Sequence, residues 1–123
     1  MMKVVTLVKD IEEVEITDFK TLTPNMIVGE ELIFVVEANY DTKRPLLYKF
    51  LKILPNGKIV CIQEFSSKKT VAFKENKSGE YKLLCHVRDM LSNKEYDDRA
   101  VLLYKVKPYE TIKIKRFETD MSY

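Results

Sequence analysis

Residues 46–65 read LLYKFLKILPNGKIVCIQEF, two apolar runs joined by Leu54-Pro55-Asn56-Gly57. Asn-Gly between apolar runs is the strongest short signal for a β-hairpin, because both residues tolerate positive φ. The stretch therefore predicts two antiparallel strands, Leu46 to Ile53 and Lys58 to Phe65. The first strand has apolar residues at both odd and even positions, so the sequence does not show which of its side chains face the core.

Further alternating runs lie on both sides of the hairpin. Apolar residues at period 2 are typical of half-buried strands, and helical periodicity is almost absent from the chain. Pro108 ends the last run because proline cannot donate to a ladder. The inward face of that last run is also left open. The five runs are Val14 to Thr17, Leu32 to Ala38, Val71 to Phe73, Tyr81 to Arg88 and Arg99 to Val106.

Seven strands within roughly 100 residues predict an all-β fold, an antiparallel β-sandwich of the immunoglobulin or fibronectin-III type. Gly79-Glu80-Tyr81 resembles the tyrosine corner of such domains, in which the hydroxyl binds upstream backbone. In immunoglobulin domains a cysteine follows that tyrosine by two residues, whereas Cys85 follows Tyr81 by four. We therefore expect a sandwich without the inter-sheet disulfide, with Cys61 and Cys85 as unbridged thiols.

The composition is that of one globular domain, with 46% hydrophobic and 33% charged residues among 123. The net charge of +2 (21 Lys and Arg against 19 Asp and Glu) is too balanced for nucleic acid or an anionic membrane to be the main partner. No apolar run approaches the length of a membrane span or a secretory signal. The compartment stays unknown from the chain itself.

Cys85 and His86 are the most conspicuous candidates for chemistry. Neighbouring side chains on a strand point to opposite faces, so a thiol and its base cannot meet there. We expect a buried Cys85 and a solvent-facing His86. The chain has one histidine and two cysteines, too few for a four-ligand zinc site. The sequence predicts no catalytic residue, no cofactor and no metal site, and hence no enzyme.

Asp89, Asp97 and Asp98 bracket the connection between the last two expected strands. Their spacing lacks the alternating ligands and central glycine of an EF-hand calcium loop. Carboxylates at strand ends commonly accept hydrogen bonds from nearby backbone amides. We therefore interpret Asp89 and Asp97 as turn-stabilising carboxylates, with a calcium site as the less favoured alternative.

An internal repeat marks the two ends of the chain. Residues 14–21, VEITDFKT, are echoed by residues 112–119, IKIKRFET, at an offset of 98 residues. That offset is the length of one sandwich domain. The repeat predicts a lead-in over 1–11, a module over 12–107 and a tail over 108–123 that resembles the first strand of a following repeat.

The tail has an apolar side that favours a partner edge. Its strand pattern, with Ile112, Ile114 and Phe117, predicts a weak head-to-tail self-association. The N-terminal third of the chain is acidic and the C-terminal stretch is basic. These opposite charges also favour a head-to-tail arrangement of neighbouring copies.

Residues across the whole domain carry a family resemblance: Leu47-Tyr48-Lys49-Phe50, Asn56-Gly57, Phe73, Ser78-Gly79-x-Tyr81, Tyr96-Asp97 and Tyr104. Between residues 14 and 106 the chain resembles the three-tyrosine (two-component regulator three Y) domain, in particular the tandem form of clostridial surface and cell-wall proteins. Tyr48 and Tyr81 match two of its tyrosines, and Phe73 stands where a third aromatic residue is expected. The resemblance implies structural aromatic residues, Tyr48, Phe50, Phe73 and Tyr81, and no catalytic residues.

The resemblance also implies a function class. It suggests a non-catalytic accessory or interaction module, a spacer or adhesive unit of a multi-domain surface or cell-wall protein outside the cytoplasm. The ligand would be protein or cell-wall glycan, and protein is preferred because the chain lacks the tryptophan that glycan platforms usually expose. The alternative is an extracytoplasmic ligand-sensing module of a signalling protein.

Overall fold

A computed structural model of the chain describes residues 13–40 and 44–108. These residues form seven β-strands and no helix, which confirms the all-β prediction. The observed strands begin or end up to a few residues from the expected runs. They are β1 (Glu15–Thr21), β2 (Leu32–Asn39), β3 (Leu46–Ile53), β4 (Ile59–Ser66), β5 (Thr70–Phe73), β6 (Gly79–Asp89) and β7 (Asp98–Val106).

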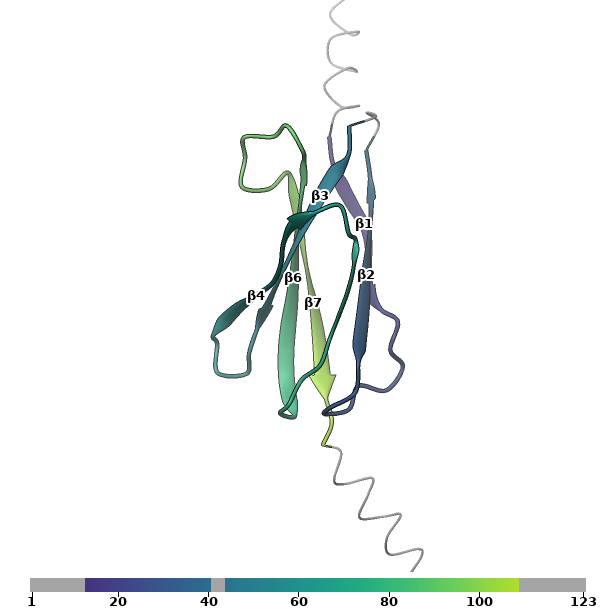
Figure 1. The fold of residues 1–123 in the computed structure, drawn as a ribbon, viewed down its shortest axis with the longest axis vertical. Helices are drawn as coiled ribbons and strands as arrows, with labels where there is room; N and C mark the ends of the chain where they lie inside the picture. The colour runs from purple at the N-terminus through teal and green to yellow at the C-terminus, as the bar shows by residue number, and fades with distance from the viewer. Residues whose placement is uncertain (1–12, 41–43, 109–123) are drawn as a thin grey trace, which may run out of the picture.

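The strands form two sheets that face each other (Figure 1). One sheet has the order β1-β2-β5 and the other the order β4-β3-β6-β7. Every strand pairing within them is antiparallel. The architecture is therefore the expected immunoglobulin-like sandwich. In constant-type immunoglobulin domains the fourth strand joins the sheet of the first two, whereas here it extends the other sheet beside β3.

The β3–β4 hairpin has a different turn from the one that Asn-Gly alone suggests. The Gly57 amide donates to the Leu54 carbonyl at 2.8 Å, so Pro55 and Asn56 are the central residues. Within this turn only Gly57 has a positive φ, 90°. Proline fixes φ near −65° and prefers the first central position, which places the turn one residue earlier. The Asn56 side chain instead accepts the Lys58 amide at 2.9 Å.

The core lies between the sheets and is built from alternate residues of β2, β3, β6 and β7. The sequence did not show which side chains of β3 and β7 face the core. In the structure they are the alternate residues that include Tyr48 on β3 and Tyr104 on β7. Cys85 is buried and Cys61 is exposed, and both are free thiols, as expected. The fully buried larger side chains are Phe34, Phe50, Leu32, Leu83, Val36, Val87 and Val106.

Aromatic rings join the two sheets near the start of β6 and the end of β7. Tyr81 and Tyr104 are stacked with their centroids 5.2 Å apart, and Tyr104 also lies 5.0 Å from Phe34 of the opposite sheet. The Tyr81 hydroxyl donates to the Lys77 carbonyl at 2.6 Å, four residues upstream. This bond is the tyrosine corner that the Gly-Glu-Tyr motif predicted.

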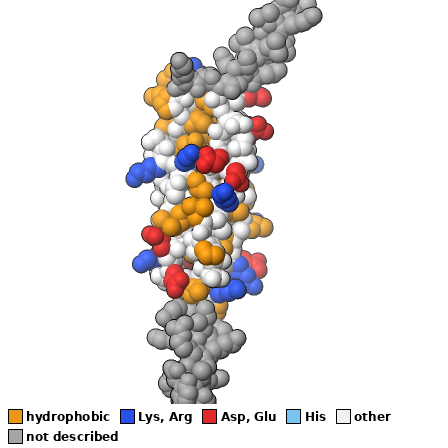
Figure 2. Space-filling view, turned by 90° about the vertical axis from the view of Figure 1, so that its right-hand side faces the viewer, with side chains coloured by type: hydrophobic (Ala, Val, Ile, Leu, Met, Phe, Trp, Pro, Cys, Tyr) orange, Lys and Arg blue, Asp and Glu red, His pale blue; other side chains and the backbone are white. Residues whose placement is uncertain are grey.

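The outer face of the three-stranded sheet is the one that Figure 2 shows. Basic and acidic side chains are interspersed there around small groups of hydrophobic ones. Lys69 and Glu37 form an ion pair at 2.9 Å, and Lys20 lies 3.5 Å from Asp18. Mixed and paired charges of this kind are typical of a solvated face.

The described chain enters at one end of the sandwich and leaves at the other (Figure 1). At the entry, the Ile16 amide donates to the Asp98 carboxylate at 2.8 Å. At the exit, the Lys107 amide donates to the Met26 carbonyl at 2.9 Å. The expected lead-in over 1–11 and the self-association strand with Ile112, Ile114 and Phe117 lie outside the described residues.

Candidate functional site

A cleft of about 1040 Å³ opens at the entry end of the sandwich. Its walls are the residues around the start of β1, the end of β2, Tyr40 and Arg44 of the β2–β3 connection, and the β6–β7 connection with the strand ends beside it. We call it the loop-end cleft. Carboxylates outnumber cations in its lining, with Glu13, Glu15, Asp89, Asp97 and Asp98 against Arg44 and Lys94.

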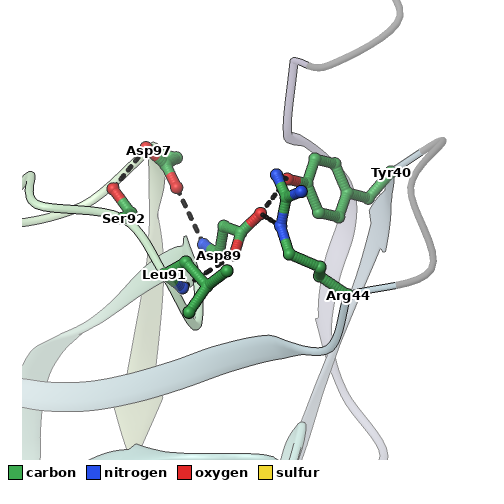
Figure 3. Close-up of polar contacts among 6 residues, drawn as sticks. All are labelled: Tyr40, Arg44, Asp89, Leu91, Ser92 and Asp97. Carbon is green, nitrogen blue, oxygen red and sulfur yellow. Dashed lines mark hydrogen bonds and ion pairs between the residues drawn. The ribbon is translucent and has the colours of Figure 1, made fainter.

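Asp89, the last residue of β6, is the centre of the contacts at this end (Figure 3). Its Oδ2 accepts hydrogen bonds from the Tyr40 hydroxyl and from Arg44 Nε, the latter at 2.6 Å. Its Oδ1 accepts the Leu91 amide at 2.8 Å, which forms an Asx turn. Arg44 Nη2 in turn donates to the Tyr40 hydroxyl at 3.1 Å. One side chain therefore joins the β2–β3 connection to the end of β6.

The same contacts set the protonation of the pair. The Tyr40 hydroxyl, followed by the Leu91 amide, lowers the pKa of Asp89 below its ordinary value. The hydrogen bond to Asp89 raises the pKa of Arg44. Both groups are therefore charged at neutral pH. A carboxylate whose oxygens accept three donors is poorly suited to act as a general base, so Asp89 works here as an anchor of the two loops.

Asp97 closes the β6–β7 connection from the other side. Its Oδ2 accepts the Asp89 amide at 2.8 Å and its Oδ1 accepts the Ser92 hydroxyl at 3.0 Å. Asp98 points to β1 instead, where it accepts the Ile16 amide. Within residues 13–40 and 44–108, no three or more His, Cys, Asp or Glu side chains are grouped so that they could hold a metal ion.

His86 is buried, and the expectation that it faces solvent is wrong. Only 8% of the residue is exposed, because the β6–β7 connection places the Tyr96 ring 4.7 Å from the imidazole. Burial lowers the pKa of His86. Cys85, of the opposite parity on the same strand, is fully buried in the core, where burial raises the pKa of its thiol to about 12. The two side chains therefore form no nucleophile–base pair.

The four aromatic residues singled out in the sequence occupy different depths. Tyr48, Phe50 and Tyr81 are buried. Phe73, on the edge strand β5, is partly buried and stacks on Phe34 at a centroid distance of 5.5 Å. The sequence identified these four residues as large aromatic side chains, but it did not indicate how deeply each of them is buried.

A buried polar cluster at the exit end was not expected from the sequence. Glu75, only 4% exposed, accepts two hydrogen bonds of 2.9 Å from Lys52 Nζ and one of 2.9 Å from the Tyr104 hydroxyl. Burial among these groups raises the pKa of Tyr104. The one local signal was a lysine at the inward parity of β3. Glu75, its partner, lies in the β5–β6 connection, and Tyr104, the other donor to Glu75, lies on β7. No short-range sequence pattern connects these residues to Lys52.

Comparison with known protein families gives one match. The model of the Y_Y_Y domain matches residues 39–107, more than half of the chain. The matched region runs from the end of β2 to the residue after β7. A comparison with curated proteins finds no match. The part of the chain that the structure describes contains no helix with the length and apolar character needed to cross a membrane.

Proposed function

The chain belongs to the Y_Y_Y domain family, and we propose that it is a protein-binding spacer module of a multi-domain surface or cell-wall protein. The family and the β-sandwich fold suggest a module without catalytic activity. The observation that carries the proposal is the position of the ends: the chain enters and leaves at opposite ends of the sandwich (Figure 1). Modules with this geometry can be joined in a line, each adding its own length.

One face of the sandwich favours protein over glycan as the ligand. Leu103, Ile59 and Val101 on the outer face of the four-stranded sheet are 70%, 62% and 54% exposed. The register places Ile59 and Leu103 in one row across the sheet, and Val101 in the row of Leu84. Ile59 and Leu103 lie at the two ends of their row, with Ile53 and Lys82 between them. Exposed aliphatic side chains on one face of a sheet fit an apolar protein surface. They offer no aromatic platform for a sugar ring.

Binding to isolated cell walls tests the proposal. The purified chain is incubated with wall sacculi that retain their surface proteins and with sacculi stripped of protein. We expect sedimentation with the first preparation only, and weaker sedimentation for Leu103→Lys. The matched control is Lys69→Glu, just before β5 of the opposite sheet, which should bind like the unchanged chain. Equal binding to both preparations would assign a glycan ligand and contradict the proposal.

The second candidate is an extracytoplasmic ligand-sensing module of a signalling protein. The loop-end cleft favours it, because its volume and polar walls would suit a small polar ligand. Binding to neither wall preparation would support this candidate over the first.

A further inference from the structure

The internal repeat extends upstream of β1. At the same offset of 98 residues, residues 3–21 align with residues 101–119. In this alignment Val4 and Val8 stand at the positions of Leu102 and Val106, whose side chains pack in or against the core. The identical pairs are Val8 and Val106, Lys9 and Lys107, Glu12 and Glu110, Ile16 and Ile114, Phe19 and Phe117, and Thr21 and Thr119.

The two halves of this alignment match different ends of the module. Residues 101–107 are the second half of β7 and the residue after it, whereas residues 15–21 are β1. The sequence of residues 3–9 therefore repeats the last strand of a module, as residues 112–119 repeat the first. By this alignment the sequence contains the end of one repeat, one whole repeat and the start of a third repeat.

We propose that the loop-end cleft is the joint with an upstream copy of this module, to whose end residues 3–9 belong and whose exit end covers the cleft. The inference rests on the proposed role as one module of a longer protein. In this arrangement the loop-end cleft is a contact between two consecutive β-sandwich modules and not a binding site for a free ligand.

The linker length restricts where the upstream copy lies. Residues 9–14 correspond to 107–112. Because β7 ends at Val106 and β1 begins at Glu15, six residues lie between the end of one last strand and the next β1. Six extended residues span at most roughly 22 Å. The last two of them, Glu13 and Val14, and the first residue of β1, Glu15, line the cleft. The exit end of the upstream copy must therefore lie beside the cleft.

The two ends of the described module carry opposite charges, so copies with this charge pattern would be complementary where they meet end to end. The exit end of the described module exposes five lysines around the β3–β4 turn, the β5–β6 connection and the end of β7, against three glutamates, Glu30, Glu31 and Glu80. The lysines are Lys58, Lys74, Lys77, Lys105 and Lys107. In the cleft, Asp89, Asp97 and Asp98 bind the module's own amides. Glu13 and Glu15 are exposed on its rim and are the carboxylates that face an arriving lysine.

The downstream repeat supplies a natural contrast. It has Thr111 and Lys113 at the positions of Glu13 and Glu15. An acidic rim is thus a property of the upstream joint and is missing from the next one. The same two substitutions make a matched variant that changes charge without changing the length of the linker.

A two-copy chain tests the joint: residues 1–110 followed directly by residues 13–123, which keeps the six-residue linker. The second copy alone is isotopically labelled, and its amide NMR spectrum is compared with that of the 123-residue chain. We expect shifted amide signals at Leu91, Ser92 and Lys94 beside the cleft. The shifts should disappear in 1 M salt, where the screening length is about 3 Å, and in the variant with Glu13→Thr and Glu15→Lys in the second copy. Glu64→Lys, on the exposed edge strand β4, is the control and should keep them.

Cleft signals identical to those of the 123-residue chain would overturn the proposal, as would a second copy that fails to fold at this register. Shifts that survive both salt and the charge variant would overturn the assigned role of Glu13 and Glu15. None of these results affects binding to wall sacculi by the single module. Failure of the joint and failure of the proposed function are therefore distinguishable.

Discussion

Replacing Lys52 by methionine should destabilise the protein far more than removing a similar ion pair from its surface. Methionine keeps most of the apolar stem of the lysine but removes the ammonium group. That group lies 2.9 Å from both Glu75 carboxylate oxygens, and the two side chains are only 13% and 5% exposed. The change leaves a carboxylate that is buried among apolar groups without its cation.

The expected loss follows from this burial. Breaking a buried ion pair by removing one partner costs about 3–5 kcal/mol, because the remaining charge is uncompensated. The Tyr104 hydroxyl still donates to Glu75, which puts the expected loss at the lower end, about 3 kcal/mol. For a domain of this size, such a loss lowers Tm by roughly 12 °C or more. It is a large part of a typical total stability of about 5–15 kcal/mol.

Urea unfolding followed by circular dichroism measures the effect in a double-mutant cycle. Glu75→Gln keeps an acceptor for Tyr104, so the double variant with Lys52→Met should recover at least 1 kcal/mol relative to the sum of the single changes. The control is Lys69→Met. Its ion pair with Glu37 has the same 2.9 Å distance but is half exposed, so the loss should stay below about 1 kcal/mol. A loss for Lys52→Met no larger than for this control, or strict additivity in the cycle, would refute the reasoning.

Three further outcomes are expected. Tyr81→Phe, which removes only the corner hydrogen bond, should cost about 1 kcal/mol in urea unfolding, whereas Tyr81→Ala should cost roughly 3–5 kcal/mol, and equal losses would contradict the corner. Native alkylation at pH 8 should modify exposed Cys61 and spare Cys85, whose thiol pKa is about 12, so a doubly alkylated native mass would be inconsistent with the core. The hydrogen bond from Tyr40 is the largest cause that lowers the pKa of Asp89 in the folded state. The ionised carboxylate therefore stabilises the fold at pH values above the pKa of an unfolded aspartate, about 4, and this stabilisation is lost as the pH falls through the lower pKa of the folded state. Asp89→Asn should flatten that part of the stability–pH curve, and an unchanged curve would show that Asp89 does not contribute.

The contacts of Asp89 show which parts of the site local sequence can indicate. Its bond to the Leu91 amide spans two residues and follows from the ordinary behaviour of aspartate at strand ends. Its bonds to Tyr40 and Arg44 span 49 and 45 residues. Neither residue stands out in the sequence, because nothing near them indicates that β3 will place them against the end of β6.

His86 shows the opposite failure. Its parity on β6 correctly directs it away from Cys85 and the core, and from parity alone it would be a solvent-facing residue. The structure buries it because Tyr96 folds back over the outer face of the sheet. Parity assigns a side chain to a face, but it carries no information on whether a later loop covers that face.

The sequence by itself determined the seven strands, the hairpin at Leu54–Gly57, the tyrosine corner at Tyr81 and the sandwich class. These features follow from side-chain alternation and turn chemistry within a few residues. Only the tertiary structure decided that Tyr48 and Tyr104 face inward, and that the loop-end cleft forms from segments distant in the chain. The physical reason is that a strand with apolar residues at both odd and even positions could turn either set of side chains toward the core. Pairing with β6 fixes the register of β3 and β7 and so decides which set faces inward, and this pairing joins residues far apart in the sequence.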